Sequence, residues 1–211
     1  MNDTASIKVW DIGIRIFHWA LVGFFAIAYV TGEIETESLH AYAGYVIIGL
    51  LAFRIVWGLI GTRHARFTDF IYSPAEIIAY LKSLVSKHPK HYLGHNPAGG
   101  AMVILLLLGL IAVSWTGLKA YEAEGKGPLV AAPSITLAIP AAQADDDWDD
   151  HHRYGHGHDE DEFWEEAHEA AVNVMLLLIF LHLAGVFASS MLHDENLVRA
   201  MITGRKDRPG E

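Results

Sequence analysis

Hydrophobic residues gather in four blocks along the chain, at residues 12–31, 41–61, 99–118 and 170–192. Each block is about 20 residues long, the length with which an α-helix crosses roughly 30 Å of bilayer hydrocarbon. The whole chain has 211 residues, of which 52% are hydrophobic. We therefore predict a single all-α integral membrane domain over residues 1–211, with four transmembrane helices in one bundle.

The connections between the blocks differ in charge, and this difference predicts the orientation. Lys and Arg accumulate at the N-terminus, in the second connection and in the C-terminal tail, whereas the first connection is acidic. The positive-inside rule then places both termini in the cytoplasm of a bacterial inner membrane. Asp11, Arg15 and His18 interrupt or border the first block, so we interpret it as a retained span and not a signal peptide. Residues 74–84 have the periodicity of a helix lying along the membrane surface.

The third connection contains an acidic, His-rich insertion over residues 120–163. Residues 120–168 hold 13 acidic and two basic residues, so this stretch accounts for the net charge of −10. A solvated acidic loop, a divalent-metal site and a docking face for a basic cytochrome c all fit this composition. The histidines that a metal would use are His151, His152, His156 and His158. No basic stripe indicates nucleic acid.

The chain has no cysteine. This excludes disulfides, Cys-ligated zinc, Cys-ligated iron–sulfur clusters and a covalently attached c-type haem. A metal cofactor must therefore rely on His, carboxylate or Met ligands.

Four histidines lie in or at the edges of the blocks, where ionisable groups are costly and are candidates for function. His168 and His182 are 14 residues apart, close to four helical turns or about 21 Å along one face. With the topology above, two layers result: His40 with His168 outside, and His18 with His182 inside. A single membrane histidine is usually an interhelical hydrogen-bonding group, but two facing imidazoles in each layer suit a non-covalent, six-coordinate b-type haem.

Small and basic residues near these histidines fit the same interpretation. Gly44 and Gly185 each follow a histidine by about one turn, which lets a flat macrocycle approach the backbone or lets helices pack closely. Arg54 lies at the inner level, where its planar guanidinium could pair with a haem propionate. Arg15 could do the same, or could anchor the topology at the cytoplasmic face. Of the two, the deeper Arg54 fits the propionate role better.

Several short motifs resemble those of the prokaryotic cytochrome b561 family. This family includes the b-type cytochrome subunits of nickel–iron hydrogenases and is similar to those of formate dehydrogenases. The resemblance covers nearly the whole chain outside residues 120–163. The matching pieces are Val9 to Asp11, Arg15 to Trp19, Leu39 to Gly44, Arg54 to Gly58, Gly94 to Pro97, His168 with Glu169, Leu181 to Val186 and Asn196 to Gly204.

The resemblance implies four transmembrane helices and two b haems, one near each membrane face, with the histidines paired as above. It also implies a protein that passes electrons between an outer partner and membrane quinone. We therefore expect a dihaem cytochrome b in contact with membrane lipid and quinone. The outer partner would be a periplasmic c-type cytochrome or a dehydrogenase subunit.

Residues 94–97 begin the third helix. Asn96 suits a cap and Pro97 a first-turn position. His95 is then an interfacial residue of the helix start, or it lies beside the inner haem, near a quinone or on a proton path.

Two other functions remain open at this point. One is an oxidoreductase that passes electrons from a small molecule such as superoxide to quinone; the acidic outer loops argue against it, because superoxide is an anion. The other is a metal-handling membrane protein with the His/Asp-rich insertion as collector. Whether the chain is itself an enzyme or a subunit of a larger oxidoreductase is left open.

Overall fold

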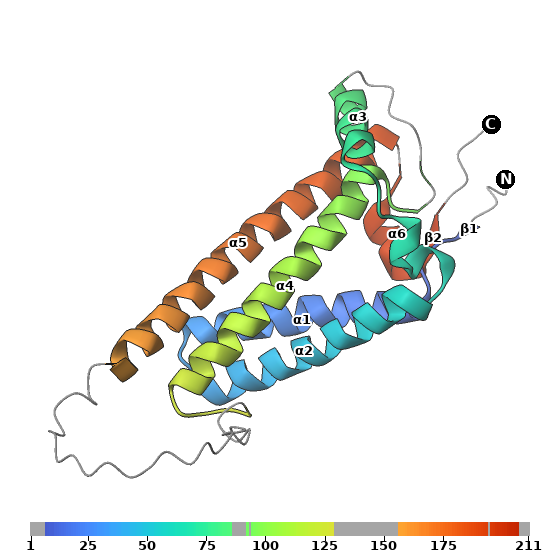
Figure 1. The fold of residues 1–211 in the computed structure, drawn as a ribbon. Helices are drawn as coiled ribbons and strands as arrows, with labels where there is room; N and C mark the ends of the chain where they lie inside the picture. Colours follow the sequence, from blue (N-terminus) through green and yellow to red (C-terminus); the bar gives the residue numbers. More distant parts are fainter. Residues whose placement is uncertain (1–6, 86–91, 93, 129–155, 194, 207–211) are drawn as a thin grey trace, which may run out of the picture. The chain divides into compact units, whose positions relative to one another are not determined.

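The regular structure of the described residues is helical apart from one short two-stranded ribbon (Figure 1). The computed structural model describes residues 7–85, 92, 94–128, 156–193 and 195–206. The helices are α1 (Ile12–Glu33), α2 (Glu37–Ile60), α3 (Pro74–Val85), α4 (Pro97–Ala123), α5 (His156–His193) and α6 (Leu197–Thr203), with two 3₁₀ turns, Arg63–Ala65 and Phe67–Asp69, after α2. The strands are β1 (Ile7–Lys8) and β2 (Arg205–Lys206).

Four helices are long and apolar enough to cross a membrane: α1, α2, α4 and the part of α5 over Asp161–Leu192. Their apolar side chains are largely exposed; Ile60, for example, is 74% exposed and Met191 is 70% exposed. Such a surface is unfavourable in water, whereas hydrocarbon tails solvate it. The prediction of an all-α chain with four membrane-crossing helices is confirmed.

The helices run further than the hydrophobic blocks indicate. α4 continues to Ala123 and α5 begins at His156, so both enter the stretch that the sequence assigns to the insertion. Glutamate and alanine residues around the start of the fourth block favour helix, and this local propensity does not depend on hydrophobicity.

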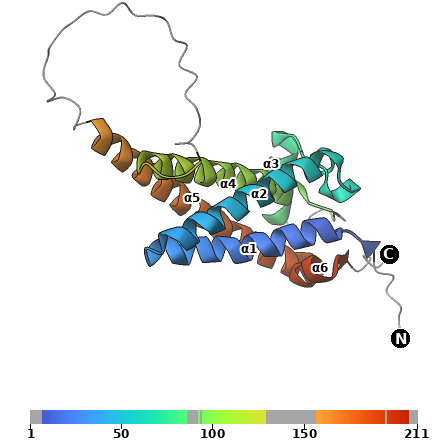
Figure 2. The ribbon, with the colours of Figure 1, turned by 90° about the horizontal axis from the view of Figure 1, so that it is seen from below.

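The chain divides into two compact units, and α4 and α5 contribute to both. The larger unit comprises residues 1–111 and 175–211, and the smaller comprises residues 112–174. Within the larger unit, α1 packs along α2 (Figure 2). A short turn joins the two helices, and Glu35 in it has a positive φ of 53°.

Side-chain caps begin four of the helices, including α6, where the Asn196 side chain accepts a 2.7 Å hydrogen bond from the backbone N–H of Arg199. Asp11 accepts a hydrogen bond from the first turn of α1. Ser73 and Glu76 form a reciprocal capping box at the start of α3, so the predicted surface segment is a helix. Asn96 accepts a 2.7 Å hydrogen bond from a backbone N–H of α4, with Pro97 at the first helical position. The predicted start of the third membrane helix is confirmed.

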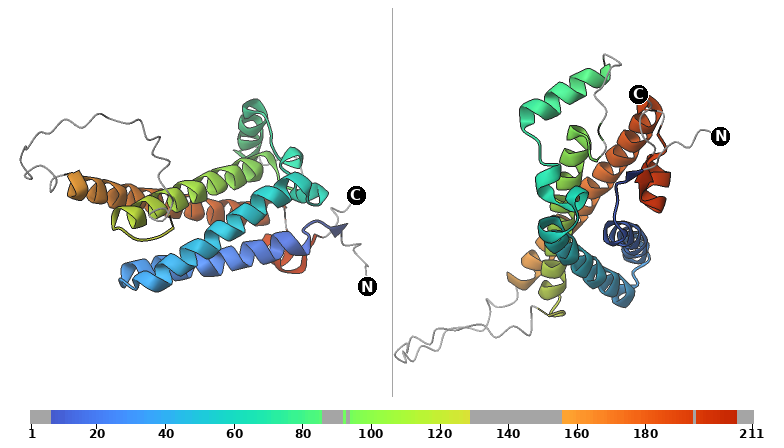
Figure 3. Two further views of the ribbon diagram at one scale, coloured as in Figure 1. Left: turned by 60° about the horizontal axis from the view of Figure 1, so that its bottom comes forward. Right: turned by 90° about the vertical axis from the view of Figure 1, so that its right-hand side faces the viewer.

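β1 and β2 pair antiparallel and form what we call the terminal β-ribbon (Figure 3). Gly204 precedes β2 and accepts hydrogen bonds from the backbone N–H groups of Val9 (2.9 Å) and Trp10 (3.1 Å). Its φ is +80°, and a Cβ there would lie 2.6 Å from the Trp10 carbonyl oxygen, so the position requires glycine. The ribbon fastens the chain before α1 to the chain after α6.

Two glycines allow the connection after α2 to pack closely. A Cβ on Gly58 would collide with the ring of Phe67, and a Cβ on Gly100 would collide with the carbonyl of Phe70. The two 3₁₀ turns therefore lie directly against α2 and the start of α4.

Candidate functional site

The larger unit brings two of the four predicted histidines together. His18 lies on α1, two turns after Asp11, and His182 lies on α5. The rings are near enough to influence each other electrostatically. The Nδ1 atom of His18 is buried and has no hydrogen-bond partner among the described residues. Buried polar atoms without a partner are uncommon in folded proteins, and a further bound group is one explanation of them.

His40 is held in one orientation by the neighbouring helix. It lies in the first turn of α2, and its Nδ1 donates a 2.8 Å hydrogen bond to the carbonyl oxygen of Ala28 in α1. A carbonyl can only accept, so the ring proton sits on Nδ1 and the lone pair of the neutral ring is on Nε2. Gly32 lies so close that a Cβ on it would be 3.1 Å from the same nitrogen. The bond and the contact together fix the direction in which Nε2 can bind a metal.

His168 is held in the same way within the smaller unit. Its Nδ1 lies 3.1 Å from the hydroxyl oxygen of Thr116. The Thr116 hydroxyl donates to the carbonyl of Ala112 at 2.9 Å, so it accepts from Nδ1–H of the histidine. The lone pair of the neutral ring is again on Nε2. His40 and His168 belong to different units, and their pairing stays a prediction.

The donor set fits a haem with two imidazole ligands. Hydrogen bonds from the other ring nitrogen to a carbonyl or hydroxyl are the usual support for a metal-binding imidazole. Room is also present, since a Cβ on Gly44 or on Gly185 would meet nothing within 4 Å. The described residues thus offer imidazole ligands, and small residues one turn away from two of them leave the backbone accessible to a flat group.

Arg54 holds the connection after α2. Its side chain is 4% exposed, and Nη1 donates a 3.1 Å hydrogen bond to the carbonyl of Ala65. The guanidinium also lies 5.0 Å from the ring centroid of Phe67 and 5.7 Å from that of Phe70. These contacts show a structural role for Arg54 that the sequence did not indicate.

Arg15 contacts the other end of the chain. One of its guanidinium nitrogens donates to the carbonyl of Ile202 in α6. Its Nε is buried and has no hydrogen-bond partner in the part of the chain that the structure describes. Arg15 therefore retains a buried donor for an anionic group, whereas a peptide carbonyl and two aromatic rings surround the guanidinium of Arg54.

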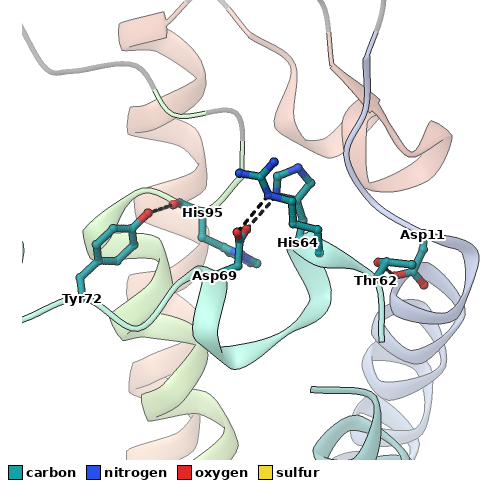
Figure 4. Close-up of polar contacts among 7 residues, drawn as sticks. Asp11, Thr62, His64, Asp69, Tyr72 and His95 are labelled. Atoms are coloured by element: carbon teal, nitrogen blue, oxygen red, sulfur yellow. Dashed lines mark hydrogen bonds and ion pairs between the residues drawn. The ribbon is translucent and has the colours of Figure 1, made fainter. Parts of the chain in front are cut away.

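His95 lies in an aromatic environment directly before α4. Its ring centroid is 4.6 Å from that of Trp10 and 4.7 Å from that of Phe70. The Tyr72 hydroxyl donates a 3.0 Å hydrogen bond to the His95 carbonyl (Figure 4). Its Nδ1 is buried without a partner among the described residues.

Burial and neighbouring charge keep His95 neutral. Burial lowers its pKa most, the positive charges of Arg54 and Lys206 lower it further, and Asp69 only partly opposes them. The resulting pKa is about 3. His95 is thus neutral at physiological pH.

Asp11 was missed as a site residue by the sequence analysis. Its Oδ1 accepts from the backbone N–H of Ile14 at 3.0 Å, and its Oδ2 accepts from Trp57 Nε1 at 3.2 Å. The same Oδ2 also accepts from the hydroxyl of Thr62, which lies beside Asp11 in Figure 4. Burial works to raise the pKa of Asp11, but these hydrogen bonds outweigh it and lower the pKa below its usual value. An Asp directly before an apolar run is a cap signal, but the partners on α2 could not be found from local sequence.

The His-rich insertion lies mostly outside the described residues, including His151 and His152. His156 and His158 fall in the first turn of α5. Within the described ranges, no group of three or more His, Asp or Glu is placed to hold a metal ion. The divalent-metal interpretation of the insertion stays a prediction.

Comparison with known proteins gives relatives that are described as B-type cytochrome subunits. A probable Ni/Fe-hydrogenase B-type cytochrome subunit of Azotobacter vinelandii is 30% identical over 60% of this chain, and the match spans 64% of that relative. The corresponding protein of Rhizobium leguminosarum bv. viciae is 24% identical over 97% of this chain and 90% of its own length. That of Escherichia coli hydrogenase 1 is 26% identical over 57% of the chain and 63% of the relative. No solved structure is significantly similar to the chain.

The model of the prokaryotic cytochrome b561 family matches residues 9–204, from the residue after β1 to the residue before β2. This range includes all four membrane helices and all four candidate haem ligands. It also agrees with the motifs from which the resemblance was inferred. The chain belongs to the prokaryotic cytochrome b561 family.

Proposed function

We propose that the protein is a transmembrane dihaem cytochrome b that transfers electrons between a periplasmic redox partner and the membrane quinone pool. Family membership implies haem b. The observation that carries the proposal is the arrangement and the hydrogen bonding of the four histidines. His18 and His182 come together in one unit, while His40 and His168 each have Nδ1 engaged and the ring lone pair on Nε2.

The inner haem site would consist of His18 and His182. Gly185 lies one turn from His182 and leaves room for the macrocycle. Arg15, with its buried Nε, would hold a propionate, and Arg54 becomes the second candidate because its guanidinium already bonds Ala65. The sequence favours Arg54 as the propionate ligand because it lies deeper in the membrane, so the preference between the two arginines is reversed.

The outer haem site would consist of His40 and His168, with Gly44 one turn beyond His40. The carbonyl of Ala28 and the hydroxyl of Thr116 orient the two rings and make Nε2 a stronger donor. In this proposal the protein lies in the bacterial inner membrane with both termini in the cytoplasm.

When bound, each haem b supplies a one-electron carrier. The protein itself orients the imidazole ligands, excludes water with its apolar side chains and provides the quinone site. We place the quinone site at the inner end, near His95. Because that side chain is neutral at rest, it could accept a hydrogen bond from a quinol and would not store a proton.

The periplasmic partner would be a c-type cytochrome or a dehydrogenase subunit. Several relatives are probable B-type cytochrome subunits of Ni/Fe-hydrogenases. Their names favour, as the partner of this protein, the catalytic subunits of a hydrogenase or of a similar dehydrogenase.

The pairing of the histidines provides the sharpest test. The purified protein should contain two low-spin b haems per chain, measured by pyridine haemochrome and by reduced-minus-oxidised spectra. His18→Ala/His182→Ala should lose one haem, and His40→Ala/His168→Ala should lose the other. His40→Ala/His182→Ala should lose both, because one ligand is removed from each site.

His64→Ala serves as the matched control, since His64 pairs with Asp69 and lies outside both proposed sites. It should retain two haems. A protein that binds no haem in haem-sufficient cells, or a His40/His182 double variant that keeps one intact haem, would contradict the proposal. Anaerobic reduction of the haems by decylubiquinol tests the quinone step separately.

A further inference from the structure

A polar pocket and an apolar groove meet where α5 is followed by α6. The pocket has a volume of about 160 Å³, and its polar lining includes Arg199, Thr203 and Arg205. The groove has a volume of about 580 Å³ and runs along the end of α5. Glu195 and Asn196 line both, so the two spaces are neighbours.

The charge of the pocket is positive. Lys206 and Glu195 form a 3.1 Å ion pair whose side chains are only 7% and 13% exposed, so their charges largely cancel. The side chains of Arg199 and Arg205 are exposed and add two positive charges to the lining. Planar guanidinium groups bind phosphate oxygens through paired, charge-assisted hydrogen bonds.

The groove continues the pocket along the part of α5 that crosses the membrane. Leu183, Phe187 and Met191 recur at intervals of four residues on one face and are 60–70% exposed. This apolar row is about 12 Å long, which matches an extended stretch of acyl chain.

α6 has the pattern of a helix at the membrane–water interface. Val198 and Ile202, one turn apart, are 52% and 53% exposed. Arg199 lies beside this apolar pair on the side that lines the pocket. Such an arrangement buries the apolar face among acyl chains and leaves the basic face among headgroups.

We propose that this composite site binds an anionic phospholipid. The phosphate lies in the pocket between Arg199 and Arg205, and an acyl chain follows the groove along Leu183, Phe187 and Met191. A quinone head carries no charge, so it does not account for two arginines around one small pocket. The inference is independent of the haem assignment.

Native mass spectrometry of the full-length holoprotein tests the proposal. The protein is released from detergent in the presence of equal amounts of palmitoyl-oleoyl phosphatidylglycerol and palmitoyl-oleoyl phosphatidylcholine. We expect roughly tenfold preferential retention of the phosphatidylglycerol. Both lipids have a phosphate that the two arginines can bind, but the positive choline ammonium of phosphatidylcholine cancels the charge of its phosphate and is repelled by the arginines. Arg199→Gln/Arg205→Gln should reduce this preference to near unity without changing the haem spectrum.

Two matched variants control for charge and for apolar area. Arg63→Gln/Arg66→Gln removes the same charge from the connection after α2 and should keep the preference. Phe187→Ala/Met191→Ala should weaken retention of phosphatidylglycerol, whereas Leu177→Ala/Phe180→Ala, on the same helix outside the groove, should not.

Three outcomes would overturn the proposal. The first is equal retention of both lipids by the unchanged protein. The second is an equal loss in the Arg63/Arg66 variant, which would indicate general surface charge. The third is displacement of the phosphatidylglycerol by decylubiquinone together with lost decylubiquinone binding in the Arg199/Arg205 variant, which would make the site a quinone site.

Discussion

Asp11 connects three parts of the larger unit through one carboxylate. One oxygen caps α1, and the other accepts hydrogen bonds from Trp57 near the end of α2 and from Thr62 just after it. Charge-assisted hydrogen bonds of this kind are stronger than neutral ones. The residue therefore fixes the start of the helix that carries His18.

Asp11→Asn should destabilise the protein by about 1–3 kcal/mol, because an amide cannot accept from all of these donors. The lowered pKa of Asp11 also predicts acid sensitivity. The stabilisation by the Asp11 carboxylate is complete above the pKa that Asp11 has in the unfolded chain. It is lost as the pH falls through the lower pKa that Asp11 has in the folded protein. Thermal unfolding monitored by circular dichroism measures both effects. Glu33→Gln, a substitution at an exposed position, is the control. Equal melting temperatures for Asp11→Asn and the unchanged protein would exclude a stabilising role of Asp11.

His95 should affect stability in a higher pH range. Its pKa is about 3 in the folded state and near 6.5 when unfolded, so the unfolded chain binds more protons between these values. Stability then falls as the pH is lowered from about 6.5, by up to about 1.4 kcal/mol per pH unit. His95→Gln should reduce this slope when melting temperatures are compared from pH 7.5 to 4.5, and an unchanged slope would contradict the prediction.

At the scale of elements, the sequence predicts what depends on local pattern. The four membrane helices follow from length and hydrophobicity, and the start of α4 follows from the cap Asn96 and Pro97. The terminal β-ribbon was not predicted, because two-residue strands carry no periodicity and pair residues from opposite ends of the chain. The bond between Arg54 and Ala65 was missed for a similar reason: it depends on how a connection folds back onto α2.

Gly204→Ala should weaken the terminal β-ribbon. The substitution places a Cβ 2.6 Å from the Trp10 carbonyl at a φ of +80°, which costs about 1–3 kcal/mol. Since the ribbon joins the ends of the segments that carry His18 and His182, we expect lower thermal stability and a shifted midpoint potential for the inner haem alone. Gly125→Ala is the matched control, because its φ is +73° and a Cβ there meets nothing within 4 Å. Equal effects of the two substitutions would show that only backbone strain matters.

The distribution of charge and apolar surface characterises the whole molecule. Four helices expose apolar side chains along their length, while the acidic residues concentrate in one connection between α4 and the membrane-crossing part of α5. The haem-ligand candidates all lie outside that connection. Haem binding and any function of the insertion should therefore be separable.

Deletion of residues 144–155, which precede α5, should leave two haems per chain and unchanged reduction by decylubiquinol. A metal-collecting protein would instead lose its divalent-metal binding. Haem quantification and zinc titration of the full-length and shortened proteins distinguish the two. Loss of either haem on deletion would show that the insertion supports a haem site.

The terminal β-ribbon also constrains how the protein is made. β2 follows all four membrane helices, so its strand leaves the ribosome after every span has been synthesised, while β1 must wait unpaired beside α1. The segment before α1 and the segment after α6 can be joined only at that late stage. A chain whose translation stops before Gly204 would therefore carry every candidate ligand yet lack the pairing of β1 with β2.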